Sequence, residues 1–437
     1  MKKLFIGVTA CLLHFCIYSQ SKNDSLPRKV TLQQAVEFSL THQPVIQQSL
    51  VDQEITEATI KSKLADWYPQ LDFHYALQHN FKVQTAVIGG NVIKLGTDNT
   101  SAAQFTVSQT IFDRDVLLAS STRVRVRRQA QQNTSSNKIE IAAAVSKAFY
   151  DVLASEQQIK VSAENINRIQ RSLKDAYNQY QAGVADKTDY KRATIGLNNA
   201  QALKKTNEEQ LRAKLEYLKS LMGYPDSANL EIEYDSLQME KEVYLDTLQN
   251  ADYTNRIEYR LLETQRSLLE ANLKYNRWSF LPSLSANGAY NLNYQNNTFS
   301  KLYNVNYPNS FAALSLNFPI FQGGKRRADI QAAQWELERN KLDMIGLKNN
   351  VNAEFTSAMS NYKGNLANYL ALKENLSLAT EVYDVIQMQY RSGIKTYLEV
   401  INSETDLRTA QINYYNALYN LLASKIDVQK ALGQINY

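Results

Sequence analysis

The sequence predicts an α+β membrane protein in which each chain supplies four β-strands and two long α-helical hairpins. Three observations support this prediction. Each half contains two segments that alternate apolar and polar residues, the pattern of strands with one apolar face. The second such segment of each half is followed by a long tract without proline, which is free to be helix. The two halves also repeat one another, so a duplicated unit is expected.

Composition disfavours most enzyme classes. The 437 residues contain four histidines and two cysteines, and both cysteines lie within the first 16 residues. Such a chain has little with which to bind a transition metal or perform thiol chemistry. The sequence also contains no nucleophile elbow, phosphate loop or H-E-x-x-H motif. We therefore predict no catalytic residues, no metal site and no cofactor.

Residues 1–20 have the features of a secretory signal peptide, because Lys2 and Lys3 precede an apolar run that ends in small residues. An alternative is lipidation at Cys11, since Val8-Thr9-Ala10-Cys11 loosely matches the motif of lipid-bearing cysteines. The formal net charge is +5, and loss of the two lysines would lower it by two. This balance indicates no nucleic-acid partner.

The two halves of the chain match at an offset near 210 residues, with five anchors in the same order. A period this long indicates a duplicated domain rather than a solenoid. We expect a first repeat over residues 21–224, a linker over 225–242 and a second repeat over 243–437. The anchors are Tyr68-Pro69 with Leu281-Pro282, Ile111-Phe112 with Ile320-Phe321, Tyr180 and Gly183 with Tyr390 and Gly393, Asp189 with Glu399, and Leu221-Met222-Gly223 with Ala431-Leu432-Gly433.

The first repeat begins with short helices and then changes to strand periodicity. Strands are predicted at about 70–82 and 102–112, joined by a polar, glycine-containing loop of about 20 residues. A helical hairpin follows over 113–222, because residues 116–181 contain neither glycine nor proline. A helix of about 65 residues would be roughly 100 Å long, more than a single globular domain needs.

The second repeat is expected to follow the same plan, with strands at about 283–295 and 310–321 and a helical hairpin over 325–433. The hairpins are predicted to turn at Gly183 and Gly393. Each hairpin would expose an apolar stripe if it stood alone. The hairpins are therefore expected to pack side by side in a coiled-coil-like wall.

The four strands, each with one apolar and one polar face, suit two different settings. Alternation of this kind is typical of a transmembrane β-barrel, and a half-buried sheet of a soluble domain has the same period. The expected export favours the barrel, as do aromatic residues near the strand starts, because aromatic side chains gather at membrane–water interfaces. The candidate interface residues are Trp67, Tyr68, Trp278 and Phe280.

Four strands cannot close a barrel, so the chain is expected to oligomerise. An open sheet edge in hydrocarbon would leave backbone groups unpaired, at several kcal/mol each. Two chains would give eight strands with a filled interior, whereas three would give twelve strands and a water-filled bore. The hairpins of three chains would continue that bore as a helical tube.

In this arrangement the chain resembles the TolC-type outer membrane efflux protein family. The resemblance implies a homotrimeric 12-stranded transmembrane β-barrel continued by a long α-helical coiled-coil barrel, in the outer membrane with a long periplasmic extension. The motifs that carry it are the two hairpin turns, the helix ends at Gly223 and Gly433, and a strand-to-helix junction with Pro319, Phe321, Gly323 and Gly324.

The resemblance also implies a function and partners. A family member exports small molecules, such as drugs, toxic compounds or metal ions, or proteins in type I secretion. Its partners are a periplasmic adaptor, also called a membrane fusion protein, and an inner-membrane transporter, and its barrel contacts outer membrane lipid. The cargo and the transporter type (RND, ABC or MFS) stay open.

The resemblance places a periplasmic gate at the second hairpin turn. There the family carries a tyrosine, an arginine and two aspartates, which correspond to Tyr390, Lys395, Glu399 and Asn402. Lys395 lacks the fork geometry of arginine, and Asn402 removes one acidic ring. Around a threefold axis Glu399 would form a carboxylate ring that favours cations, and Asp189 from the first turn is a candidate for a second ring.

Helix capping is an alternative role for these carboxylates. Thr396 and Glu399 have the spacing of a capping box, and Asp186 or Thr188 could cap the corresponding helix of the first half. The resemblance further implies that the adaptor docks around the turns. The candidate docking residues are Gly183, Val184, Ala185, Gly393 and Ile394.

Two functions from different classes follow from the sequence. The first is an outer membrane channel-tunnel, and the alternative is a periplasmic or surface coiled-coil protein that binds partners without forming a channel. Heat-modifiable trimer migration and conductance in planar bilayers would separate the two.

Overall fold

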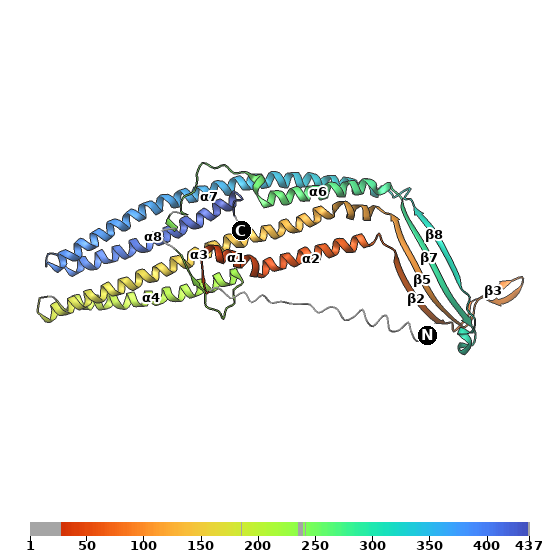
Figure 1. Ribbon diagram of the computed structural model, residues 1–437, viewed down its shortest axis with the longest axis horizontal. Helices are drawn as coiled ribbons and strands as arrows, with labels where there is room; N and C mark the ends of the chain where they lie inside the picture. The colour runs from red at the N-terminus through yellow and green to blue at the C-terminus, as the bar shows by residue number, and fades with distance from the viewer. Residues whose placement is uncertain (1–27, 185, 235–238, 241, 436–437) are drawn as a thin grey trace.

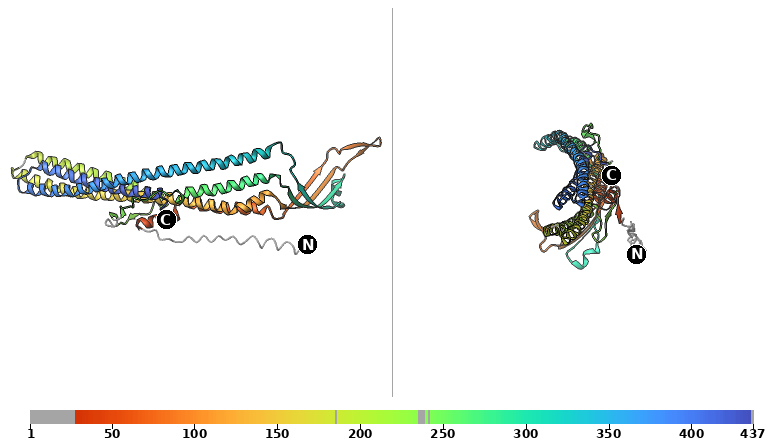
Figure 2. Two further views of the ribbon diagram at one scale, coloured as in Figure 1. Left: turned by 90° about the horizontal axis from the view of Figure 1, so that it is seen from above. Right: turned by 90° about the vertical axis from the view of Figure 1, so that its left-hand side faces the viewer.

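The computed structural model describes residues 28–184, 186–234, 239–240 and 242–435, so the predicted signal peptide lies outside the described residues. The chain forms an elongated wall with two helical hairpins at one end and a β-sheet at the other (Figure 1). Seen along its length, this wall is curved, with one concave and one convex side (Figure 2).

The first copy contains two short strands that the sequence did not predict. They form a β-hairpin inside the segment expected to be a polar loop, because β-branched residues flank Gly89 and Gly90, which turn the chain at positive φ. In order, the elements are β1 (Lys29–Val30), α1 (Leu32–His42), α2 (Pro44–Ala65), β2 (Gln70–His79), β3 (Thr85–Ile88), β4 (Asn91–Lys94), β5 (Asn99–Phe112), α3 (Arg114–Gln181) and α4 (Lys187–Met222).

The second copy repeats the plan, and its α6 (Ile257–Arg277) corresponds to α2 as the helix before the first strand. The segment expected to be a plain linker contains β6 (Glu231–Ile232), which pairs in parallel with β1. The later elements are η2 (Tyr253–Asn255), α6 (Ile257–Arg277), η3 (Trp278–Phe280), β7 (Ser283–Asn296), η4 (Phe299–Asn304), β8 (Asn309–Asn317), α7 (Lys325–Arg391) and α8 (Tyr397–Ala431).

The two copies meet in one antiparallel sheet with the order β2, β5, β7, β8. The central pair joins the copies, with Phe105 of β5 opposite Tyr290 of β7. β2 and β8 are the edges, and every residue of both strands is exposed. Large apolar side chains point into solvent on both edges; Leu71 is 70% exposed and Leu314 is 72% exposed.

The main core lies where the two hairpins meet α1 and the segment between the copies. Tyr362 of α7 is fully buried; its hydroxyl donates to the Val243 carbonyl (2.8 Å) and accepts from the Leu245 amide (2.9 Å). At the end of α4, Gly223 has φ 68°, and a Cβ there would lie 2.5 Å from the His42 carbonyl oxygen, so only glycine fits. Other fully buried side chains include Phe149, Leu153, Leu218, Met222 and Leu421.

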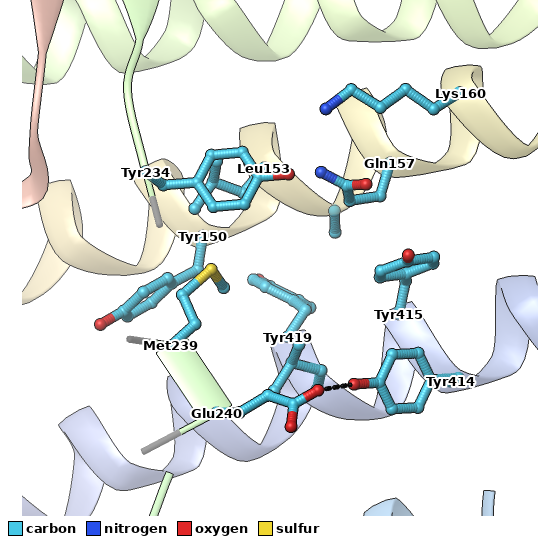
Figure 3. A pocket seen from close by; sticks show the side chains of 12 residues that line it. Tyr150, Leu153, Gln157, Lys160, Tyr234, Met239, Glu240, Tyr414, Tyr415 and Tyr419 are labelled. Atoms are coloured by element: carbon cyan, nitrogen blue, oxygen red, sulfur yellow. Dashed lines mark hydrogen bonds between the residues drawn. The ribbon is translucent and has the colours of Figure 1, made fainter. Parts of the chain in front are cut away.

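Tyr234, Met239 and Glu240 of the segment between the copies line a pocket of about 290 Å³ together with side chains of α3 and α8 (Figure 3). Glu240 accepts hydrogen bonds from Tyr414 of α8 (2.7 Å) and Lys373 of α7 (2.6 Å), and the Lys373 bond holds the pKa of Glu240 below its ordinary value. Lys160 of α3 lies 5.7 Å from the ring centre of Tyr234. These contacts tie the segment to both hairpins.

Within the part of the chain that the structure describes, no helix combines the length and the apolar character needed to cross a membrane.

Candidate functional site: the tips of the helical hairpins

The two hairpin turns have the same backbone geometry. α3 ends before Gly183 (φ 72°) and α7 ends before Gly393 (φ 75°), as predicted. The amide of the next residue bonds back to the last helical turn in both cases, from Val184 to the Gln179 carbonyl and from Ile394 to the Gln389 carbonyl, each at 2.9 Å. This is the Schellman arrangement, which satisfies carbonyls that a helix end leaves unpaired.

The tips expose apolar side chains. Val184 is 79% exposed and Ile394 is 72% exposed, and a Cβ added at Gly183 or Gly393 would meet no atom beyond the adjoining backbone within 4 Å. Ala185, the remaining residue of the predicted docking set, lies outside the described residues.

Both return helices begin with a side-chain cap. In the first copy Asp186 accepts the Thr188 amide at 2.6 Å, so Asp186 is the cap rather than Thr188. In the second copy the predicted capping box is confirmed: Glu399 accepts the Thr396 amide at 2.9 Å. The half-buried Asp189 lies in the first turn of its helix.

Glu399 combines its cap with an ion pair. Lys395 donates to its carboxylate at 2.6 Å, and this bond, followed by the one from the Thr396 amide, holds the pKa of Glu399 below its ordinary value. The group is therefore ionised at neutral pH. Asn402, one turn further along α8, is exposed. Whether these residues line a constriction stays a prediction.

Tyr390 joins the two hairpins. Its hydroxyl donates to the side-chain carbonyl of Gln179 at 3.1 Å, and its ring lies 5.9 Å from that of Tyr397. Both tyrosines are buried, in a cluster with Ala193 of α4 and Val400. Burial, followed by the nearby Asp175 and Asp189, raises the pKa of Tyr390. The predicted gate residue is thus part of an apolar contact between α4 of the first hairpin and α7 and α8 of the second.

A buried ion pair that sequence reasoning missed lies beside this cluster. Glu404 of α8 is 6% exposed, and its carboxylate lies 3.6 Å from the Arg168 guanidinium of α3, too far for a hydrogen bond. Burial raises the pKa of Glu404 to about 7, although Arg168 and Arg408 oppose the shift. The sequence signal was a charged residue on the stripe formed by Tyr397, Val400 and Leu407.

The ion pair borders a cavity of about 240 Å³ between α3, α4 and α8. Arg192 and Arg408 line it with Asn165, whose buried side-chain oxygen has no hydrogen-bond partner. Arg168 also lies 3.8 Å from the Glu164 carboxylate of its own helix. Tyr383 of α7 also lies beside the ion pair, because the Arg168 guanidinium is 5.8 Å from the centre of its ring.

The predicted strand-to-helix junction forms a second candidate region. Gly323 and Gly324 both have positive φ (57° and 86°), and α7 begins directly after them. Arg326 donates to the Pro319 carbonyl at 3.2 Å, which fixes the turn. Phe321 is 86% exposed.

The four predicted interface aromatics lie at the helix-side ends of β2 and β7. Trp67, Tyr68 and Phe280 are exposed, with Tyr68 at 69%. Trp278 is half-buried, and the Lys274 ammonium lies 4.7 Å from its ring centre. In both copies the aromatics thus directly precede the first strand of the sheet, and their contact with lipid stays a prediction.

Comparisons with known proteins agree with this architecture. Residues 36–224 and 255–434 match the family described as "Outer membrane efflux protein". Outer membrane protein TolC of Escherichia coli (strain K12) is 20% identical over 449 residues, which cover all of this chain and 87% of that protein. Among solved structures, the Campylobacter jejuni CmeC outer membrane channel has a TM-score of 0.73 at 14% identity, over 92% of this chain and 85% of that one. The open state of the Neisseria gonorrhoeae MtrE outer membrane channel has a TM-score of 0.72 at 17% identity, over 93% and 89%.

Proposed function

The chain belongs to the outer membrane efflux protein family, and from this premise we propose that three copies form one continuous duct from the periplasm to the exterior. The protein is an outer membrane efflux channel with a long periplasmic helical region.

The main support for a trimer is the pair of open sheet edges. β2 and β8 end a four-stranded sheet whose edge strands are fully exposed and rich in apolar side chains. In hydrocarbon each edge needs a partner strand, so β8 of one copy pairs with β2 of the next. Three copies supply twelve strands, enough for an aqueous bore, and the curved wall of each copy becomes one third of the tube.

The exposed tips suit a docking role. Val184 and Ile394 leave apolar side chains in water at the end of the chain farthest from the sheet. Such positions favour contact with a partner protein. We assign this surface to a periplasmic adaptor, and through it to an inner-membrane transporter that selects small molecules or proteins as cargo.

The second turn is the proposed constriction. Tyr390, Lys395, Glu399 and Asn402 lie at or just after the Gly393 turn, and Asp189 lies in the first turn of the neighbouring return helix. Repeated around a threefold axis, the Glu399 carboxylates form a cation-attracting ring near the end of the tube.

Two measurements on the purified protein test the proposal. The unheated protein should migrate as a trimer in denaturing gels and as a monomer after heating, and it should form discrete ion-conducting channels in planar bilayers. A stable monomer without conductance would overturn the duct and favour a coiled-coil interaction protein.

A further inference from the structure

The β3–β4 hairpin extends beyond the sheet, at the end of the molecule opposite the helical tips (Figure 1). Its two strands pair in register around the Gly89-Gly90 turn, with Ile88 opposite Asn91 and Val87 opposite Val92. Both glycines have positive φ, 62° and 84°, which is the geometry of a tight two-residue hairpin. The hairpin leans toward the concave side of the wall (Figure 2).

Both faces of this ribbon carry exposed apolar side chains. Residues paired across an antiparallel ribbon share a face. Val87 and Val92 therefore lie on one face, with Thr85 and Lys94 toward the base, and Ala86, Ile88 and Ile93 lie on the other face with Asn91. The four larger side chains are strongly exposed: Val87 70%, Val92 72%, Ile88 56% and Ile93 44%. Of the eight strand residues only Lys94 is charged.

Nothing else in the described part of the chain packs extensively on the hairpin. Its strands contact mainly each other, and it is anchored at its base by hydrogen bonds such as that from the Asn80 amide to the Asp98 carbonyl at 2.7 Å. An isolated two-stranded ribbon is marginally stable in water. A ribbon with two exposed apolar faces therefore needs cover from outside this chain.

The two-sided pattern fits cover by further copies of the same chain. A lipid surface or a single external protein would require only one apolar face. A cyclic assembly instead joins two different surfaces of each copy, so that one face of every copy meets the other face of its neighbour. The lean toward the concave side directs the hairpin to the axis of the proposed tube rather than to its outside.

We propose that the three β3–β4 hairpins pack in a ring around the threefold axis at the outer mouth, with the Val87–Val92 face of one copy against the Ala86–Ile88–Ile93 face of the next. This inference rests on the proposed trimer. The ring buries the apolar side chains of all three ribbons, and it places them across the route by which cargo leaves.

Disulfide trapping tests the ring directly. The described residues contain no cysteine, and Cys11 and Cys16 are replaced by serine as a precaution. In V87C/I93C the two new thiols lie on opposite faces of one hairpin, so they cannot reach each other. In the proposed ring, the thiol at position 87 of one copy meets the thiol at position 93 of the next copy. Mild oxidation of the assembled protein should convert it to covalent trimers in non-reducing denaturing gels after heating.

The matched control is V87C/V92C. Val87 and Val92 lie directly opposite each other, next to the Ile88–Asn91 pair that flanks the turn. Their Cα atoms are close enough for a disulfide within one hairpin. The control should therefore stay monomeric after heating. We expect about fivefold or more covalent trimer in V87C/I93C than in the control, since geometry is the only difference between them.

The outcomes separate the ring from the duct. If the reduced, unheated variants migrate as trimers but V87C/I93C yields no more covalent trimer than V87C/V92C, the ring is wrong while the proposed duct stands. If the wild-type chain does not form trimers at all, the proposed duct itself fails.

Discussion

The first and second hairpin turns share a backbone and differ in the surroundings of their side chains. In the first turn Tyr180 and Tyr177 pack their rings on Tyr190 at 5.1 and 5.7 Å, and Tyr177 is 47% exposed. In the second turn Tyr390 and Tyr397 are buried against the other hairpin. The two copies thus share the turn and a cap on the return helix. Their aromatic residues differ: those of the first copy pack within one hairpin, and those of the second copy pack between the hairpins.

The difference extends to charge. Glu404 corresponds to Thr194 in the first copy, at the offset of the repeat, so the buried ion pair with Arg168 has no counterpart there. The aromatic residues of the second turn therefore depend on packing between the hairpins, next to a group whose charge depends on pH, whereas those of the first turn pack on Tyr190 of their own hairpin. Three predictions test this asymmetry.

The largest effect is expected at Glu404. Its folded pKa of about 7 lies above the ordinary 4.5, so between these values the folded chain binds a proton that the unfolded chain releases. This contribution stabilises the fold at low pH and is lost as pH rises from about 4.5 to about 7. Relative to Glu404→Gln, the wild type should lose about 3 kcal/mol of local stability across that window.

Hydrogen exchange of the α8 amides measures this loss. Wild type and Glu404→Gln are compared at pH 5 and at pH 7.5, so that the intrinsic exchange rates cancel at each pH. Thr194→Val, which alters the corresponding residue of the first copy, is the control and should show no pH-dependent difference. A constant gap between wild type and Glu404→Gln at both pH values would contradict the prediction.

The second effect concerns the Tyr390 hydroxyl. Tyr390→Phe removes the bond to Gln179 and should cost about 1 kcal/mol, with some addition because the glutamine oxygen loses its partner. Tyr180→Phe is the matched variant in the first copy and should be nearly neutral. Thermal denaturation of both proteins measures the contrast, and equal shifts in Tm would show that the hydroxyl bond between hairpins contributes nothing.

Local features of both turns could be predicted from the sequence, because they depend on residues close in the chain. The positive-φ glycines and the Thr396–Glu399 box follow from spacing, and the strands follow from alternation. The β3–β4 hairpin was missed because its polar flanks suggested a loop, although Gly89-Gly90 between β-branched residues is a hairpin signal. Arg168 and Glu404 could not be paired, since only the packing of α3 on α8 brings them together.

The smallest effect on stability is expected at Glu399, and it separates the two roles of that carboxylate. Glu399→Gln keeps an oxygen that can accept the Thr396 amide and removes the charge, whereas Glu399→Ala loses both. Glu399→Gln should therefore keep a Tm close to that of the wild type, and Glu399→Ala should lower it. Because the folded pKa is depressed, the stabilising contribution of the carboxylate is present at neutral pH and is lost only as pH falls.

Channel recordings complete this comparison. If three Glu399 carboxylates attract ions at the proposed constriction, both variants should lose cation preference and block by divalent cations to the same extent, because charge rather than capping sets the local potential. If Glu399 acts only as a cap, Glu399→Gln should conduct as the wild type does. Asp186→Asn, which removes the charge of the cap in the first copy while keeping an acceptor for the Thr188 amide, should leave conductance unchanged in either case.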